Sequence, residues 1–312
     1  MANTCIRYIK YKYIVPLFYW IPTSPSAGDG VGVVQFVIAG SGDKWGYDLM
    51  NDNVQPERLS IYCLDGFKVY RGRALIPSQK WQRQKVALLF KYLLVANRPV
   101  PRHELISEFW PHLEEPAARH NLAVTLYNLR RTLWPQRTGG EVPFYIKSDA
   151  SYIKLNRSSI AFYDVRAFNA FRIEGLGAYI QGLWDQAVAA LIAANNLYKN
   201  DFLADTIGEI WIQEERAQLK KSRLDLLEHL TEVLIKLGRH REAYPYAETM
   251  VQLDPCREEG HRMLMKILIN LGHRSQAIAQ YQQCKKILQR ELGIQPGSKT
   301  NNLYHQIISG ES

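Results

Sequence analysis

The sequence has little of what marks a metal protein, a disulfide-rich protein or a membrane protein. Its cysteines lie far apart, so neither the ligand spacing of a metal site nor a disulfide framework is present: Cys5, Cys63, Cys256 and Cys284. The apolar run from Tyr13 to Ile21 contains a proline and is too short to span a bilayer. We therefore expect a cytoplasmic protein with reduced thiols, no metal or other cofactor, and no membrane contact.

Catalytic motifs are also missing. Gly-x-Ser-x-Gly, which marks nucleophilic hydrolases, does not occur, and His103-Glu104 lacks the second histidine of a zinc-protease helix. The Gly-rich loop at residues 40–43 lacks the spacing and the Lys-Ser/Thr ending of a phosphate-binding loop. We expect no enzyme activity and no catalytic residue, and we assign residues 1–58 to no domain.

Positive charge is concentrated in one part of the chain. The 312 residues carry a net charge of +9. Between Leu59 and Asp164 there are sixteen Lys and Arg against eight Asp and Glu, so this segment holds a net charge of +8. A polyanion such as double-stranded DNA is the partner that this balance favours. The length fits about two domains, of which the first is basic and the second is close to neutral.

A single amphipathic helix is predicted over residues 117–133. At 100° per residue, one stripe of this helix is built of leucines: Leu122, Leu126, Leu129 and Leu133. The opposite face is polar, with asparagines at its flanks: His120, Val124, Tyr127 and Arg131, flanked by Asn121 and Asn128. This pattern fits a helix that reads the major groove of DNA, although an ordinary surface helix with a solvated basic face has a similar pattern.

The side chains on this helix support the interpretation that it binds DNA. Asn can pair bidentately with adenine, Arg with guanine, and a Val methyl group can contact the methyl group of thymine. The expected base contacts are Asn121, Val124, Thr125, Asn128 and Arg131, of which Thr125 lies nearest the leucine stripe. The expected phosphate contacts are Arg119, Arg130, Lys147 and Lys154. His120 and Tyr127 complete the candidate DNA-binding face.

The order of elements around this helix predicts a winged helix. A hairpin centred on Asp65-Gly66 is followed by helices at about 82–96 and 102–110, and then by the 117–133 helix. A second, basic hairpin at 144–155 follows directly and would form the wing. The alternative for this hairpin is a plain sheet edge protected by lysines. We assign residues 59–163 to a winged-helix DNA-binding domain of the α+β class.

Internal repetition predicts an all-α domain at residues 164–308. The segment Leu237-Gly238 to Ala243 recurs at Leu271-Gly272 to Ala277, an offset of 34 residues, which is the tetratricopeptide period. A more distant copy begins at Gly182. We expect glycine in the turns between paired helices and small residues where the helices approach closely. The polar stretch at residues 214–221 is either a solvated face or a ridge that contacts a partner.

Several runs of residues resemble a known family. LSIYCLDGFKVYRG, the run from Trp81 to Pro111, and EEPAARHNLAVTLYNLRRTLWP are similar to the OmpR-like winged helix of SARP-type bacterial transcription activators. FYDVRAFNAF and KKILQRELGIQPGSKTNNLYHQI are similar to the bacterial transcriptional activator domain that follows it in this family. The resemblance implies promoter binding by copies of the protein on repeated half-sites, self-association on DNA, and recruitment of RNA polymerase.

The reader helix of the family corresponds to Ala117–Leu133. Leu129-Arg130-Arg131 keeps the family pattern, whereas Ala123 stands where the family carries a charge. The functional alternative is an adaptor that does not bind DNA and uses its tetratricopeptide-like repeats to bind proteins. The net charge of the first domain argues against that alternative.

Overall fold

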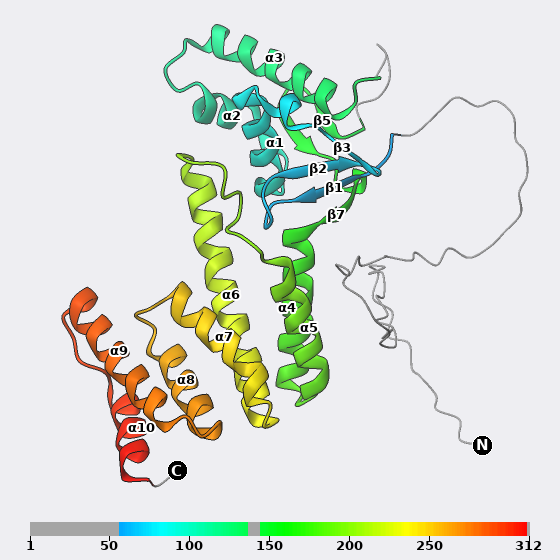
Figure 1. Ribbon diagram of the computed structural model, residues 1–312. Helices are drawn as coiled ribbons and strands as arrows, with labels where there is room; N and C mark the ends of the chain where they lie inside the picture. The colour runs from blue at the N-terminus through cyan, green and yellow to red at the C-terminus, as the bar shows by residue number, and fades with distance from the viewer. Residues whose placement is uncertain (1–55, 137–143, 311–312) are drawn as a thin grey trace, which may run out of the picture. The chain divides into compact units, whose positions relative to one another are not determined.

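The computed structural model describes residues 56–136 and 144–310. The apolar run from Tyr13, the loop at residues 40–43 and most of the unassigned segment 1–58 lie outside the described residues. The described chain begins with short strands and three helices and continues as helices to its end (Figure 1). This order agrees with the predicted small α+β module followed by an all-α region.

A four-stranded sheet opens the described chain, in the order β3-β2-β1-β7. Its strands are β1 (Leu59–Tyr62), β2 (Lys68–Arg71), β3 (Ala74–Leu75) and β7 (Ile160–Tyr163). The β1–β2 hairpin was predicted from the alternation of apolar residues, and Leu59, Ile61 and Val69 are fully buried on one face. Gly66 has a φ of +75°, which favours glycine in the turn. Strand β7 pairs in parallel with β1 across about a hundred residues of sequence and was not predicted.

Three helices pack beside this sheet: α1 (Gln84–Ala96), α2 (Arg102–Phe109) and α3 (Glu115–Leu133). Two short 3-10 turns flank them in the sequence, at Ser78–Trp81 and Arg157–Ser159. The predicted inward positions of α1 are all buried: Val86, Leu89, Phe90, Leu93 and Leu94. Pro116 lies in the first turn of α3, where its missing N–H has no intrahelical partner to lose.

A three-stranded sheet, in the order β4-β6-β5, carries the predicted wing. Its strands are β4 (Val100–Pro101), β5 (Ile146–Ser148) and β6 (Tyr152–Leu155). Ile146 and Ile153 are buried, whereas Lys147 and Lys154 are cross-strand partners on the other face. The hairpin is therefore a strand pair with one apolar face and one basic face.

The rest of the described chain is helical, as predicted from residue 164 onward. The helices are α4 (Asp164–Ile180), α5 (Trp184–Leu197), α6 (Ile210–Lys236), α7 (His240–Leu253), α8 (Glu258–Asn270), α9 (Arg274–Leu292) and α10 (Ser298–Ser309). Figure 1 shows successive helices lying side by side as hairpins. Gly182, Gly238 and Gly272 have φ values of 70–79°, so each predicted turn glycine adopts the left-handed conformation. The repeat-matched residues Ala187, Ala243 and Ala277 are fully buried, which allows close helix approach.

The sheet module and the first helical hairpin share a hydrogen-bonded junction. One carboxylate oxygen of Asp164 accepts from the backbone N–H groups of Cys63 at 2.6 Å and Leu64 at 2.7 Å, and its other oxygen accepts from Val165 at 2.8 Å. The α5–α6 connection also pairs with this turn, because Leu203 N donates to the carbonyl of Cys63 at 2.9 Å. The sequence predicts a domain boundary between residues 163 and 164. At this point strand β7 ends and helix α4 begins, with no linker between them.

Charged side chains reinforce the junction from both sides. Lys91 of α1, almost fully buried, donates to the hydroxyl of Thr206 at 2.6 Å and lies 4.3 Å from the ring centre of Phe67. Arg216 of α6 donates to three backbone carbonyls of the α5–α6 connection, those of Phe202, Leu203 and Thr206. Arg216, placed by its sequence in a polar surface stretch, therefore holds a loop rather than facing solvent or a partner.

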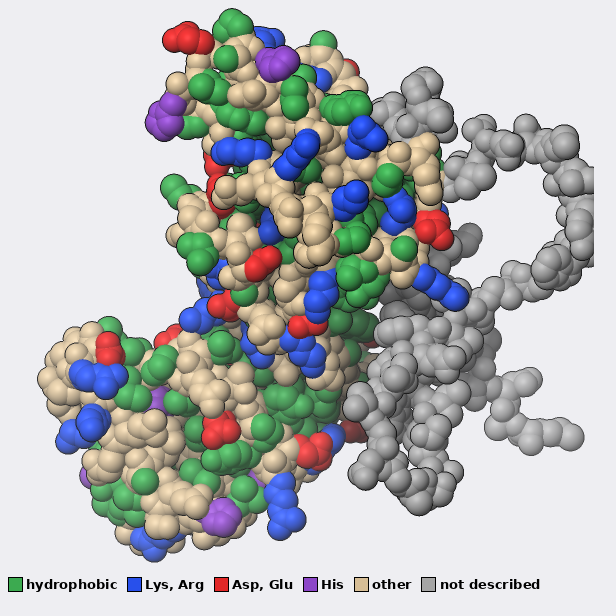
Figure 2. Space-filling view, turned by 45° about the horizontal axis from the view of Figure 1, so that its top comes forward, with side chains coloured by type: hydrophobic (Ala, Val, Ile, Leu, Met, Phe, Trp, Pro, Cys, Tyr) green, Lys and Arg blue, Asp and Glu red, His purple; other side chains and the backbone are tan. Residues whose placement is uncertain are grey.

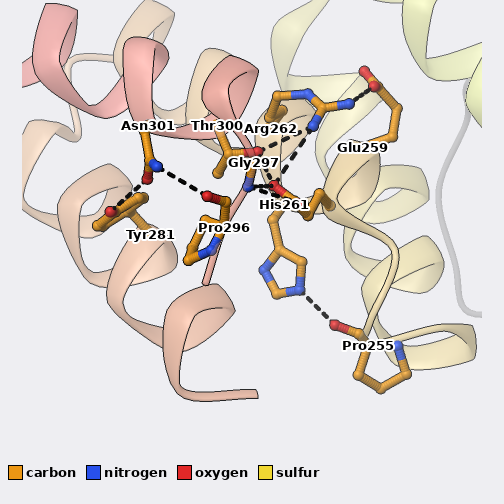
Figure 3. A network of polar contacts seen from close by, with 10 residues as sticks. Pro255, Glu259, His261, Arg262, Tyr281, Pro296, Gly297, Thr300 and Asn301 are labelled. Atoms are coloured by element: carbon orange, nitrogen blue, oxygen red, sulfur yellow. Dashed lines mark hydrogen bonds and ion pairs between the residues drawn. The ribbon is translucent and has the colours of Figure 1, made fainter. Parts of the chain in front are cut away.

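The final helix is fastened to α8 by a polar network (Figure 3). The carboxylate of Glu258 accepts from the backbone N–H of Gly297 at 3.0 Å and from the hydroxyl of Thr300. Arg262 donates to Thr300 Oγ1 at 3.0 Å and forms an ion pair with Glu259. Glu258 thereby supplies the N-terminal acceptor that α10 lacks in its own sequence. In the described part of the chain, no helix is long and apolar enough to cross a membrane.

Candidate nucleic-acid interface

Helix α3 has two faces, and the structure separates them as the sequence predicts. The leucine stripe is buried: Leu122, Leu126, Leu129 and Leu133 are each at most 4% exposed. These residues pack α3 against α1 and α2. Burial of four leucines contributes on the order of 6–12 kcal/mol to holding the helix in place. The position of the opposite face is therefore set by the core beneath it.

The opposite face of α3 is open to solvent. Val124 is 44% exposed and Tyr127 is 59% exposed, so a methyl-bearing and an aromatic side chain lie on this surface three residues apart. His120 and Arg131 are exposed on the same face, and the guanidinium carbon of Arg131 lies 6.0 Å from the ring centre of Tyr127. The structure thus brings together a protruding apolar pair, an imidazole and a guanidinium on one helix surface.

The flanks of this face carry partly accessible amides. Asn121 and Asn128 are half-buried, so their amide groups lie at the border between the leucine stripe and the open face. Thr125 is only 8% exposed and lies on the buried side. At 100° per residue Thr125 is close in angle to Leu122 and Leu129, which explains why its hydroxyl is not available on the open face. Thr125 is therefore not a candidate for a base contact.

The two neighbouring arginines of α3 differ in their surroundings. Arg130 donates to the carbonyl of Ile146 at 3.1 Å and to the hydroxyl of Ser148 at 2.7 Å, both on β5. It therefore ties α3 to the hairpin. The guanidinium of Arg119, by contrast, is exposed and donates to the carboxylate of Glu115 one turn earlier, at 2.8 Å. An exposed pair of this kind contributes at most about 1 kcal/mol, so a phosphate could replace Glu115 as its acceptor.

The hairpin beside α3 presents its basic face without acidic neighbours. Lys147 is exposed and Lys154 half-buried, and within the described residues neither forms an ion pair. The turn between the strands is well ordered, because the carboxylate of Asp149 accepts from the backbone N–H groups of Ser151 and Tyr152. These hydrogen bonds lower the pKa of Asp149. Asp149 is thus committed to the turn and does not neutralise the lysines.

A partly buried cluster of aromatic and charged groups, which the sequence did not reveal, supports α2. Tyr92 of α1 donates to the carboxylate of Glu104 at 2.8 Å, and Arg98 donates to the same oxygen at 2.7 Å. Burial alone would raise the pKa of Glu104, but these two donors hold it below its usual value. The ring of Tyr92 packs edge-on against Phe109 of α2 and Trp211 of α6. The helical region therefore contacts the elements that position α3.

Basic side chains are spread over the winged-helix part of the surface. Figure 2, in which the top of the molecule comes forward, shows Lys and Arg side chains scattered across its upper part. Across residues 56–136 and 144–310, no group of three or more His, Cys, Asp or Glu side chains is placed to hold a metal ion. The arrangement is suited to contact with an extended polyanion.

Comparison with known proteins finds one matching domain family and several similar transcription regulators. Residues 163–308 match the family described as the bacterial transcriptional activator domain. The regulatory protein DnrI of Streptomyces peucetius is 28% identical over 251 residues, which cover 78% of this chain and 89% of DnrI. The transcriptional regulatory protein MoaR1 of Mycobacterium tuberculosis is 28% identical over 238 residues, covering 76% of this chain and 75% of MoaR1. The chain thus carries a bacterial transcriptional activator domain and is similar to transcription regulators of the SARP type.

A solved structure extends the similarity to the fold. EmbR of Mycobacterium tuberculosis, determined in complex with a low-affinity phosphopeptide, matches with a TM-score of 0.69 and 22% sequence identity. The match covers 82% of this chain and 66% of the EmbR chain. The likeness to EmbR concerns the fold, in which a small α+β module precedes a helical domain, and the sequence relatives are transcription regulators.

Proposed function

We propose that this SARP-type protein is a sequence-specific DNA-binding activator that reads promoter repeats with α3. The observation that carries the proposal is the open face of α3, where Val124, Tyr127 and Arg131 stand exposed above a buried leucine stripe. Apolar side chains exposed to this degree beside a guanidinium fit a groove containing both thymine methyl groups and guanine acceptors.

Base contacts and backbone contacts come from different elements in this proposal. His120, Asn121, Val124, Tyr127, Asn128 and Arg131 face the base edges, while Arg119 and the hairpin lysines Lys147 and Lys154 contact phosphates. Arg130 positions the hairpin relative to α3 through its two hydrogen bonds to β5. Phosphate contacts would set the register and most of the salt dependence of binding, and base contacts would set the choice of sequence.

We assign protein partners to the helical domain. Residues 164–312 contain equal numbers of basic and acidic side chains, so this region gains little from a polyanion. Stacked helical hairpins form extended surfaces that bind proteins. RNA polymerase is the partner implied by the activator family, and self-association of copies on adjacent half-sites follows from the reading of promoter repeats.

The test is selection from a pool of random duplexes by the full chain, followed by fluorescence anisotropy at low and physiological salt. We expect enrichment of a short motif, repeated at about one helical turn. Arg131→Ala should then lose roughly 10- to 100-fold in affinity for the selected duplex, equivalent to 1–3 kcal/mol, with little loss on a scrambled duplex.

Arg290→Ala, an exposed arginine on α9, serves as the matched control and should bind the selected duplex like the parent. Equal losses of Arg131→Ala on selected and scrambled DNA would make Arg131 a phosphate contact. Binding without enrichment would contradict sequence reading. No binding at either salt concentration would favour a protein-binding adaptor.

A further inference from the structure

A basic pocket lies on the winged helix where the C-terminal end of α1 meets strands β5 and β6. It has a volume of about 270 Å³. Four of its lining residues are cationic: Arg98, Lys147, Lys154 and Arg157. Apolar atoms of Leu93 and Leu155 complete its wall. Among the described residues that line it, none is acidic.

The positive charges of this pocket are mostly unneutralised. Arg98 is paired with Glu104 at 2.7 Å, outside the pocket lining. Lys147 and Lys154 lie directly opposite each other in the strand register, and like charges in that position destabilise a hairpin. Neither lysine nor Arg157 forms an ion pair with any described residue. A pocket with three unpaired cations holds charge that an anion would neutralise.

A fourth unpaired cation lies nearby. Arg166 of α4 is close enough to Arg157 that, together with burial, it lowers the pKa of the Arg157 guanidinium. Chain folding has therefore brought four cations from β5, β6, the following turn and α4 to one side of the winged helix. An anion bound among these cations would offset their mutual repulsion.

The C-terminal end of α1 explains only part of this cluster. Asn97 caps α1 in the left-handed conformation, so the last carbonyl groups of the helix point toward this side. These carbonyls amount to about half a negative charge, which is far less than the charge of Lys147, Lys154 and Arg157 together. More than two positive charges remain, which matches the 1.5–2 negative charges of a phosphomonoester near neutral pH.

We propose that this pocket binds a phosphate group, with Lys147, Lys154 and Arg157 as its charge partners. The shared chemistry has two sources: a small phosphomonoester, whose remaining atoms would contact Leu93 and Leu155, or a backbone phosphate of bound DNA. The pocket does not depend on recognition of a DNA sequence by α3, so it is tested first without DNA.

The experiment uses the full chain and inorganic phosphate as the probe, titrated against sodium chloride at equal ionic strength and pH 7.5. We expect phosphate to raise the melting temperature by roughly 3–5 °C at ten times its Kd. Arg157→Gln and Lys154→Gln should each weaken phosphate affinity about tenfold. Lys80→Gln, an exposed lysine of the same module outside the pocket, should leave it unchanged.

The source of the phosphate is then distinguished with a duplex present. A phosphate response that persists in the DNA complex identifies a small phosphomonoester as the ligand. A response abolished by DNA, together with a smaller salt dependence of DNA binding in Arg157→Gln, identifies the DNA backbone. The proposal is overturned if phosphate gives no more stabilisation than chloride, or if both pocket variants respond like the parent while their circular dichroism shows them folded. The phosphate titrations without DNA test the pocket even if the protein binds no duplex.

Discussion

The winged helix and the helical repeats use their arginines in different ways. In the repeats, Arg257 joins α6 to the start of α8 through Glu228, and Arg262 fastens α10 through Thr300 while it pairs with Glu259 on its own helix. On the winged helix, Arg131 has no acidic partner among the described residues, and Arg157 lies beside another arginine. Arginine therefore serves folding at these positions of the repeats, and also at Arg98 and Arg130 of the winged helix, whereas Arg131 and Arg157 are left available. Substitutions that remove charge should therefore lower stability at the first kind of arginine and lower DNA affinity at the second.

The strongest test concerns the junction between the two regions. Asp164→Ala removes the acceptor of three backbone N–H groups, two of them in the β1–β2 turn, and leaves those groups buried without a partner. We expect the free energy of unfolding to fall by about 3 kcal/mol. Urea unfolding of the full chain, followed by circular dichroism, measures the change. Asp149→Ala, at an exposed turn, is the control and should cost less than about 1 kcal/mol.

Asp164 also makes stability depend on pH. Burial raises its pKa to about 6, against the backbone N–H groups that lower it. In the unfolded chain the pKa is near 4, so the folded state binds the proton more tightly and loses stability as pH rises from about 4 to 6. Asp164→Asn does not titrate. The stability of the parent relative to Asp164→Asn should fall by about 2–3 kcal/mol between pH 4 and pH 7. A difference that stays constant with pH would contradict this explanation.

Removal of an arginine in the repeats should affect stability without affecting DNA. The side chain of Arg262 is 16% exposed, and Arg262→Ala leaves Glu259 and Glu258 without their cation. We expect a loss of about 2 kcal/mol in the free energy of unfolding, with the affinity for the selected duplex unchanged at temperatures where the protein is folded. Arg290→Ala, which breaks only an exposed pair, should change stability by less than about 0.5 kcal/mol.

The smallest expected effect is on the hairpin, where a substitution should weaken DNA binding without changing stability. Lys147→Gln should lower DNA affinity by about three- to tenfold on selected and scrambled duplexes alike, and reduce the slope of log affinity against log salt by about 0.9. Its free energy of unfolding should stay within about 0.5 kcal/mol of the parent, because no described residue pairs with Lys147. A loss confined to the selected duplex would instead make Lys147 a base contact.

Local pattern predicted most of the winged helix. The β1–β2 hairpin, the buried positions of α1 and the two faces of α3 all follow from periodicity and turn residues close in sequence. The 34-residue offset likewise predicted the turn glycines Gly238 and Gly272. These features depend on residues that are close together in the sequence, and a single sequence without relatives can reveal only such local relations.

Long-range pairings could not be predicted in the same way. Strand β7 is short, and its partner β1 lies about a hundred residues earlier, so nothing near Ile160 marks it as part of the sheet. Asp164 looks like an ordinary helix-start residue, yet its carboxylate holds the β1–β2 turn. Arg216 stands in a charged stretch, and only the fold directs it to the carbonyls of Phe202 and Leu203. Thr125 is a local case, since its angle at the edge of the leucine stripe left its side undecided and the structure buries it.

The absence of a linker between β7 and α4 has a geometric consequence for promoters. Because the junction at Asp164 and Leu203 ties the helical domain to the winged helix, a copy bound in the major groove as we propose would carry its repeats at a fixed rotational phase around the duplex. Two copies on half-sites one turn apart would then present their repeats on the same side of the DNA. Adding about five base pairs between the half-sites would turn one set to the opposite side while leaving each half-site intact.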